Sequence, residues 1–409
     1  MSAVLSRCSL VALGVFAATV AHGGEQAKPA KHYELTPIVA TNDAQCEPGF
    51  AQRTFTRRIN ASGQVIGYQV CWEPSGIPET PFFINFGWGY LFTPGVASRL
   101  LPNVAAGDFG TLGRALNDAG VAVGWEATET SLSAPLWLPS GGASYAVEPD
   151  PCSSFTIAQA DDINNHGSIA AGATRATATG CRGSWILKRA DGSEAVGPLL
   201  GHPDAMNEHD VMAGQQGNTA VKWSPTLGVV ALAPEGIPGV ERLRAFNIND
   251  REQIVGEWQH FELNDQCLKG ADAVFWDSNG AAQKLERLRH DTDAIALGIN
   301  DQGLIVGNSR SHSGCNTFDP DLQRAVIWHK GKVTDLNKLL EKSDAREIQL
   351  IQASDINERG QIAAFGFYKN RPLDKCWDFV FNPDTGEGVY DTTLRCRSIH
   401  AFLMTPKDE

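Results

Sequence analysis

The stretch GINDQGLIVG, residues Gly298 to Gly307, is one copy of a short motif that recurs along the chain. An apolar residue and an Asn are followed by a polar turn, and then by an apolar run that ends in Gly. The other copies begin INASGQVIG at Ile59, LNDAGVAVG at Leu116, INNHGSIAAG at Ile163, MNEHDVMAG at Met206, INDREQIVG at Ile248 and INERGQIAAFG at Ile356. The recurring Asn residues are Asn60, Asn117, Asn164, Asn207, Asn249, Asn300 and Asn357. A fixed motif at a variable interval indicates one repeated structural unit with loops of different length.

A second pattern follows each motif. It is a short apolar run with an aromatic residue, such as Trp276 in AVFWDS and Trp328 in AVIWHK, with Phe92 and Phe381 in the first and last units. Each unit therefore consists of four predicted short strands: one before the Asn, the apolar run after the turn, the aromatic strand and one more. Only residues 336–351 have helical periodicity.

Repeated four-stranded sheets must stack on one another, because a single sheet cannot bury both of its faces. A ring of such sheets leaves only short edges unprotected. We therefore predict an all-β fold, a β-propeller of four-stranded blades. The motif count favours seven blades, with six or eight still open. HYELTPIV from His32 resembles the fourth strand of a unit and HAFLMTP from His400 a third strand, so the N- and C-terminal strands would close the ring by pairing. Alternatively, Phe381 marks the true third strand and the tail begins an eighth, partial unit.

The recurring Asn is interpreted as a part of the scaffold. Asn tolerates left-handed backbone geometry and can bond its own main chain, and the Gly three residues later completes the turn. The fourth copy has Asp210 in place of that Gly. The alternative is a calcium-binding loop, but such loops need several carboxylates, whereas Ser62 and Asn165 interrupt the acidic pattern. No metal or cofactor is predicted.

The ends and the charge of the chain restrict its location and partners. Arg7 precedes an apolar stretch from Ser9 to Ala21, the pattern of a secretory signal peptide, which we place at residues 1–23. Residues 24–409 would form one domain of a secreted or periplasmic protein, without a later membrane span and, we expect, monomeric. The net charge of -13 argues against a nucleic-acid partner.

Eight cysteines remain after the predicted signal peptide, which contains Cys8. An even number in an exported protein indicates disulfides. A metal site is the alternative, but no Cys-x-x-Cys and no cluster at ligand spacing is present. Pairing in sequence order would join Cys46 to Cys71, Cys152 to Cys181, Cys267 to Cys315 and Cys376 to Cys396.

The motif, the following A-V-x-W and the HAFLMTP ending together resemble the HAF-repeat family of extracellular bacterial proteins. The family takes its name from a His-Ala-Phe sequence, here His400, Ala401 and Phe402. The resemblance spans nearly the whole mature chain and implies an exported β-propeller-like protein, without an established activity or catalytic residues. Only the last unit has the full His-Ala-Phe, and Phe365 is an added residue before its Gly.

The candidate binding site comes from the predicted architecture. The strand before each Asn would be innermost and would line a central channel. Its charged residues are Arg57, Arg58, Arg114, Asp161, Asp162, Asp204, Arg244 and Asp355. Arg and Asp side chains around a channel can hold a sugar, a peptide or a small acid through bidentate hydrogen bonds. The alternative is a solvated ring of structural salt bridges.

No nucleophile elbow, phosphate-binding loop, dinucleotide fingerprint or zinc-protease motif is present, and no catalytic residue is predicted. We favour a non-catalytic binding or scaffold role toward an extracellular glycan or protein. The alternative is a polysaccharide hydrolase or lyase using Asp161, Asp162 and Asp355, whose mutual repulsion would raise their pKa. A third possibility is an exported shell protein without a specific ligand.

Overall fold

The computed structural model describes the repeat region in thirteen segments: residues 28–40, 51–71, 87–104, 110–127, 131–148, 156–178, 180–232, 242–261, 268–311, 320–376, 378–381, 388–391 and 395–407. The predicted signal peptide, residues 1–23, lies outside them, as do Cys46, Cys152, Cys267 and Cys315.

The strand that precedes each recurring Asn is the first strand of a four-stranded group, and it ends at the apolar residue before that Asn. It pairs antiparallel with the apolar run after the turn. These first strands are β2 (Gln52–Ile59), β6 (Thr111–Leu116), β10 (Thr156–Ile163), β14 (Gly201–Met206), β18 (Arg242–Ile248), β22 (Asp293–Ile299) and β26 (Ile348–Ile356).

Each second strand lies between the first strand and the third strand of its group. They are β3 (Val65–Cys71), β7 (Ala122–Ala127), β11 (Ile169–Thr177), β15 (Met212–Gln216), β19 (Ile254–Phe261), β23 (Ile305–Arg310) and β27 (Ile362–Tyr368).

The third strands contain the aromatic residues that the sequence pattern singled out. Trp137, Trp185, Trp276 and Trp328 are fully buried there, which makes them the largest side chains of the core. The strands are β4 (Trp88–Thr93), β8 (Ser131–Trp137), β12 (Gly180–Lys188), β16 (Thr219–Ser224), β20 (Leu268–Trp276), β24 (Gln323–His329) and β32 (His400–Pro406).

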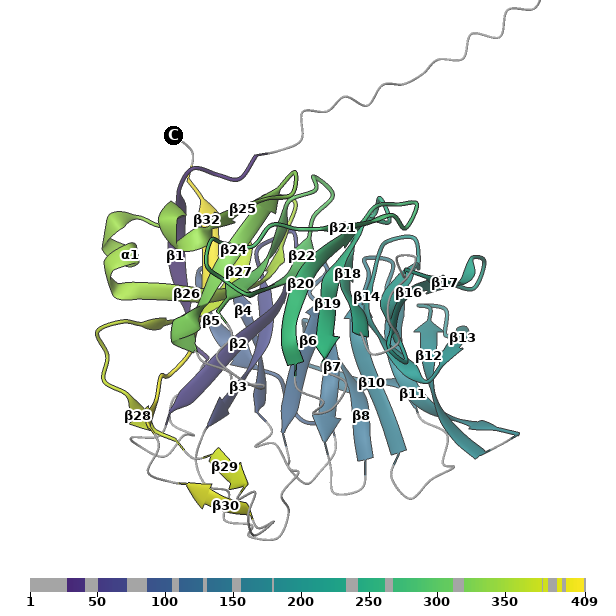
Figure 1. The fold of residues 1–409 in the computed structure, drawn as a ribbon. Coiled ribbons are helices and arrows are strands. Elements are labelled where there is room, and N and C mark those ends of the chain that lie inside the picture. Colours follow the sequence, from purple (N-terminus) through teal and green to yellow (C-terminus); the bar gives the residue numbers. More distant parts are fainter. Residues whose placement is uncertain are drawn as a thin grey trace, which may run out of the picture.

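The outermost strands complete the groups, and Figure 1 shows the resulting sheets standing side by side around the molecule. In the last group this place is taken by the N-terminal strand, which pairs with β32 from Tyr33 opposite Pro406 to Ile38 opposite Ala401. The outermost strands are β1 (Tyr33–Ile38), β5 (Val96–Leu100), β9 (Ala143–Val147), β13 (Glu194–Leu199), β17 (Gly228–Ala231), β21 (Ala282–Lys284) and β25 (Lys332–Asp335). A short parallel contact between β8 and β10 joins the second and third groups into one continuous sheet.

Each sheet buries both of its faces against different neighbours. On β20, Val274 and Trp276 belong to an apolar cluster shared with β18, whereas Ala273 belongs to a cluster shared with β22 and β23. Apolar residues at consecutive positions of this strand are thereby explained, since neither face meets water. The four-stranded antiparallel sheets confirm the predicted fold class, an all-β propeller.

An insertion interrupts the last group between its second and third strands. It contains β28 (Asp374–Lys375), which pairs with β31 (Arg395–Cys396), and β29 (Asp378–Phe381), which pairs with β30 (Gly388–Asp391). A disulfide joins Cys376 to Cys396, with a Cα–Cα distance of 5.7 Å, as predicted. The third strand of the last group is β32, the HAFLMTP segment, with Met404 opposite Ile362 in the place that Trp has in other groups. The alternative, in which Phe381 marks the third strand, is wrong, because Phe381 lies in the insertion.

Two short helical segments precede β26. They are the 3-10 helix η2 (Leu336–Leu339) and α1 (Lys342–Glu347), and a third, η1 (Pro320–Leu322), precedes β24. The predicted helix over residues 336–351 therefore ends early. Ile348 to Ile351 belong to β26, because their apolar side chains enter the core of the last sheet. None of the helices in the described part of the chain is long and apolar enough to cross a membrane.

The recurring Asn links each group to the next. Asn60 accepts hydrogen bonds from the main-chain N–H of Ser62 and Gln64, and its Nδ2 donates to the main-chain oxygen of Asn117. The same donation recurs at every copy, at 2.9 to 3.3 Å, and the seventh Asn donates back to the first. The scaffold role of the Asn thus has a specific form, a closed ring of hydrogen bonds between sheets.

The Asn of each turn tolerates a left-handed backbone, as the sequence analysis noted. In the structure the left-handed residue is instead the one three positions after the Asn. It is Gly in five copies, with φ between 72° and 82°, and Asp210 and Glu252 adopt φ values of 58° and 57° in the other two. Local bonds offset the backbone strain at these two sites. Asp210 accepts from Asn164 and pairs with Arg189, and Glu252 pairs with Lys222.

Candidate binding chamber in the central channel

Every first strand has an irregularity at the same place, three residues before its Asn. There the pairing register skips one residue, as between Thr56 and Arg58 on β2. A bulge places two residues opposite one on the partner strand and re-aims their side chains. The skipped residues are Arg57, Arg114, Asp161, Asp204, Phe246, Leu297 and Ser354. All seven line one cavity of about 330 Å³ in the channel, which we call the chamber.

The rim of the chamber is formed by residues that lie five positions before an Asn, namely His202, Arg244 and Gln352. The rim is open to solvent at His202, because 42% of that side chain is exposed. The side chain of Asp161, by contrast, is fully buried. The chamber therefore opens past His202 and ends near Asp161.

Aromatic rings hold two of the chamber's guanidinium groups in place. Arg114 lies 4.7 Å from the ring centre of Trp125, on β7, and Arg244 lies 4.8 Å from that of Phe246. Arg244 also pairs with the buried Glu257, at 3.5 Å. Stacking on an aromatic face orders a guanidinium while leaving its edge available for hydrogen bonds.

Asp161 and Asp204 share one cation. Nη2 of Arg114 lies 3.1 Å from Oδ1 of Asp161 and 3.9 Å from Oδ1 of Asp204. Burial raises the pKa of Asp161 to about 6, because the loss of hydration outweighs the attraction of Arg114. The chamber thus contains a carboxyl group that can change its protonation near neutral pH.

Arg58 closes the channel beyond the chamber. Its Nη2 donates to the main-chain oxygens of Asp204 and Phe246, on β14 and β18, at 3.1 and 3.2 Å. It lies 4.0 Å from Oδ2 of Asp162, and burial raises the pKa values of Asp162 and Asp355 despite its charge. Because Arg58 lines the cavities on both sides, it separates the channel into two compartments.

Asp162 and Asp355 are held by structural hydrogen bonds. Oδ2 of Asp162 accepts from the main-chain N–H of Met206, and Oδ2 of Asp355 accepts from that of Ile59. Oδ1 of Asp355 accepts from Asn247. Asp162 thereby links two successive sheets, whereas Asp355 links the last sheet to the first and the fifth, so the two carboxylates serve the fold.

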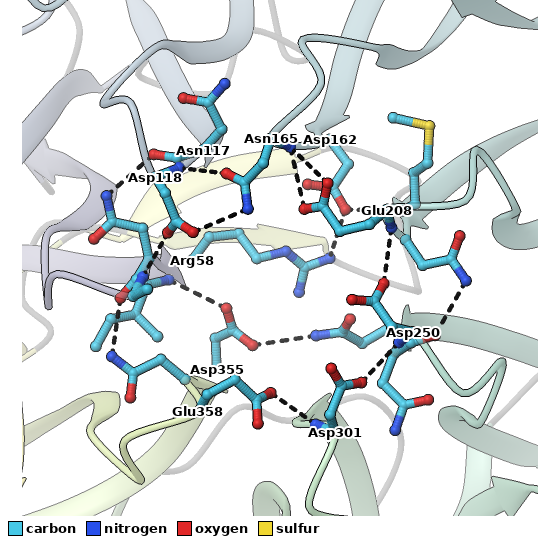
Figure 2. A pocket seen from close by; sticks show the side chains of 18 of the residues that line it. Arg58, Asn117, Asp118, Asp162, Asn165, Glu208, Asp250, Asp301, Asp355 and Glu358 are labelled. Carbon is cyan, nitrogen blue, oxygen red and sulfur yellow. Dashed lines mark hydrogen bonds and ion pairs between the residues drawn. The ribbon is translucent and has the colours of Figure 1, made fainter.

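The second compartment, of about 240 Å³, is surrounded by the residues that directly follow the recurring Asn. Except for Ala61, the side chain of each accepts a hydrogen bond from the main-chain N–H of its counterpart in the preceding copy, at 2.7 to 3.1 Å. Figure 2 shows this acidic ring, with Arg58 lying across its interior. Its side-chain acceptors are Asp118, Asn165, Glu208, Asp250, Asp301 and Glu358.

Burial, followed by repulsion between neighbouring carboxylates, raises the pKa values of Glu208, Asp301 and Glu358. Among the described residues, no three His, Cys, Asp or Glu side chains are grouped so that they could hold a metal ion. The acidic ring thus supplies a second set of hydrogen bonds between sheets, and it makes this end of the channel strongly acidic.

All eight residues that the sequence analysis selected line the channel, but in different surroundings. Arg58, Asp162 and Asp355 line the second compartment, with Arg58 shared by both. The other five, Arg57, Arg114, Asp161, Asp204 and Arg244, line the chamber. The aromatic lining, Trp125 and Phe246, was missed. Phe246 could have been found from its place three residues before Asn249, whereas Trp125 lies on a second strand and has no such signal.

Comparisons with known proteins place the chain among distant structural relatives. No protein-family model matches it, and no curated protein does, so the HAF-repeat resemblance stays a prediction. Similar solved structures include virginiamycin B lyase from Staphylococcus aureus, with 9% identity, a TM-score of 0.46, and coverage of 81% of this chain and 96% of that one. The β-propeller domain of the trilobed protease from Pyrococcus furiosus is 11% identical with a TM-score of 0.35, covering 88% of this chain and 97% of that one. A lectin from Aleuria aurantia is 10% identical with a TM-score of 0.34, covering 86% and 96%. Identities this low assign no ligand to this chain.

Proposed function

We propose that this protein is an exported β-propeller binding protein that takes an end group of an extracellular glycan into the chamber, without a covalent step. The export rests on the predicted signal peptide. The observation that carries the proposal is the polar lining of the chamber. The Nε atoms of Arg114 and Arg244 and Oδ2 of Asp161 are buried without a hydrogen-bond partner in the described structure. Buried polar groups are almost always satisfied, so unsatisfied ones on residues that line a cavity favour a polar ligand.

The shape of the site favours an end group over a protein surface. A stable protein interface buries roughly 800 Å² on each partner, whereas the chamber is a recess of about 330 Å³. Donors and acceptors at one recess, beside two half-buried aromatic rings, match the hydroxyl groups and C–H surfaces of a sugar ring.

A polysaccharide hydrolase or lyase is the second candidate. One observation favours it: Asp161, with its pKa raised to about 6, lies beside Asp204. Glycoside hydrolysis uses such a pair, one carboxyl group as the acid and the other as base or nucleophile. Against it, Asp161 is buried at the floor and bonded to Arg114, which is the arrangement of a positioned ion pair.

The test is a screen of immobilised polysaccharides and oligosaccharides against the exported protein, scored for retention and for new reducing or unsaturated ends. We expect retention of at least one glycan, without new ends, and loss of that retention in Phe246→Ala. The matched control is Arg346→Ala, at an exposed position of α1, which should bind like the wild type. New ends produced by the wild-type protein would support the enzyme instead, and no retention of any glycan would contradict the proposal.

A further inference from the structure

Arg57 differs from the other guanidinium groups of the channel. Its Nη2 donates to the hydroxyl of Tyr68 at 3.3 Å, and it lies 5.2 Å from that ring. Within the described residues no carboxylate lies at ion-pair distance from it. Its Nε is buried without a hydrogen-bond partner. Arg57 is thus a half-buried cation whose charge the protein itself leaves unpaired.

The surroundings of Arg57 make this unpaired charge costly. Burial, together with the positive charges of Arg114 and Arg58, lowers its pKa below the usual range. A guanidinium nevertheless stays charged at physiological pH. An anion bound beside Arg57 would offset both the lost hydration and the repulsion between the guanidinium groups.

We infer that the chamber selects a ligand that carries a carboxylate, namely an acidic sugar such as a uronic acid, and that Arg57 binds this carboxylate. The inference rests on the proposed function and specifies its ligand class. A planar guanidinium matches a carboxylate through two parallel hydrogen bonds. Arg114 is near enough to Arg57 for its charge to depress the pKa of Arg57, and its Nε also lacks a partner.

The other charges of the channel restrict the ligand further. Asp161 and Asp204 lie in the same chamber and would repel a dianion such as a phosphate monoester more strongly than a single carboxylate. At the far mouth, the acidic ring repels anions, and Arg58 closes the passage between the compartments. The acidic sugar would therefore enter past His202, on the side of the chamber's rim.

The experiment measures the affinity of the full exported chain for three forms of one oligosaccharide: oligogalacturonate, its methyl ester, and the neutral oligogalactose of equal length. We expect the acid to bind roughly tenfold to a hundredfold more tightly than its ester, as a charge-assisted bidentate pair implies. Arg57→Ala should abolish this preference, whereas Arg57→Lys, which keeps the charge without the planar fork, should retain part of it. Arg346→Ala should leave the preference unchanged.

The outcomes separate the inference from the proposed function. Equal binding of acid, ester and neutral sugar by the wild type would overturn the inference and leave the binding function standing. An acid preference that survives in Arg57→Ala would overturn the assignment to Arg57. If none of the three binds and no other glycan is retained, the proposed function itself is wrong. Thermal unfolding of both Arg57 variants shows whether they are folded.

Discussion

The Asn357 side chain donates a hydrogen bond to the main-chain oxygen of Asn60, at 2.9 Å, although the two residues are 297 positions apart. It is the one link of the Asn ring that runs from the last copy of the motif to the first. The side-chain oxygen of Asn357 also accepts from the N–H groups of Arg359 and Gln361, so a single amide holds both the turn and the closure.

Replacement of Asn357 by Ala should therefore destabilise the fold strongly. It leaves buried main-chain groups without partners, and we expect a loss of about 2–4 kcal/mol in the free energy of unfolding. Denaturant titration checks this value. Asn218→Ala, in an exposed turn, is the control and should change stability by less than about 0.5 kcal/mol. Equal effects of the two substitutions would contradict a specific role of the ring.

The acidic ring is incomplete at one position. Ala61 offers no side-chain acceptor, so the N–H of Glu358 cannot be bonded as the N–H of Asp118 is bonded by Asn165. Ala61→Asn should complete the ring and stabilise the protein by about 0.5–1.5 kcal/mol without adding charge. Ala61→Leu, which adds bulk without an acceptor, is the comparison. A melting temperature raised by Leu as much as by Asn would show that hydrogen bonding is not the cause.

Arg57 and Arg58 are neighbours in sequence, but their truncation should destabilise the fold to very different extents. Arg58→Ala leaves Asp162 and Asp355 buried without their cation, and we expect a loss of about 3–5 kcal/mol. Arg57→Ala removes only the contacts with Tyr68, the stacking and a long hydrogen bond to its hydroxyl, and we expect a loss of no more than about 1 kcal/mol. Urea unfolding of both variants measures the difference. Similar losses would mean that Arg57 is also structural.

Asp161 should make stability depend on pH. Its pKa is about 6 in the folded protein, above its ordinary value of 3.8, so the folded state binds its proton more tightly than the unfolded state does. This contribution is fully present below pH 3.8 and is lost as the pH rises through 6. Relative to Asp161→Asn, the wild type should lose up to roughly 3 kcal/mol between pH 4 and pH 7. Unfolding at both pH values, with Glu347→Gln as an exposed control, tests the sign. A constant difference would show that the pKa of Asp161 is not raised.

The mature protein should contain no free thiol. Cys71 and Cys181 are disulfide-bonded, like Cys376 and Cys396. Thiol titration in denaturant should find none, and a reductant should lower the melting temperature, since each disulfide restricts the unfolded chain. Several titratable thiols would contradict the predicted framework of four disulfides, of which three involve cysteines outside the described residues.

Much of the fold could be predicted from the sequence because its signals are local. The Asn with Gly three residues later defines a turn, and the apolar runs beside it define strands. Trp276 and Trp328 identify strands buried on both faces. Two local signals were misleading. Phe381 has the aromatic pattern of a third strand but lies in the insertion, and Ile348 to Ile351 have helical periodicity but form a strand that packs in the last sheet.

The sequence by itself determined the repeated unit, the all-β fold and the set of charged residues that face the channel, because period and turn chemistry depend only on neighbours along the chain. Only the tertiary structure decided what those charges do. A bulge in β2 sends Arg57 into the chamber and Arg58 across the channel to β14 and β18. Whether a guanidinium is paired depends on carboxylates that other strands bring to it, such as Asp162, which lies far along the chain from Arg58, and no local pattern encodes that contact.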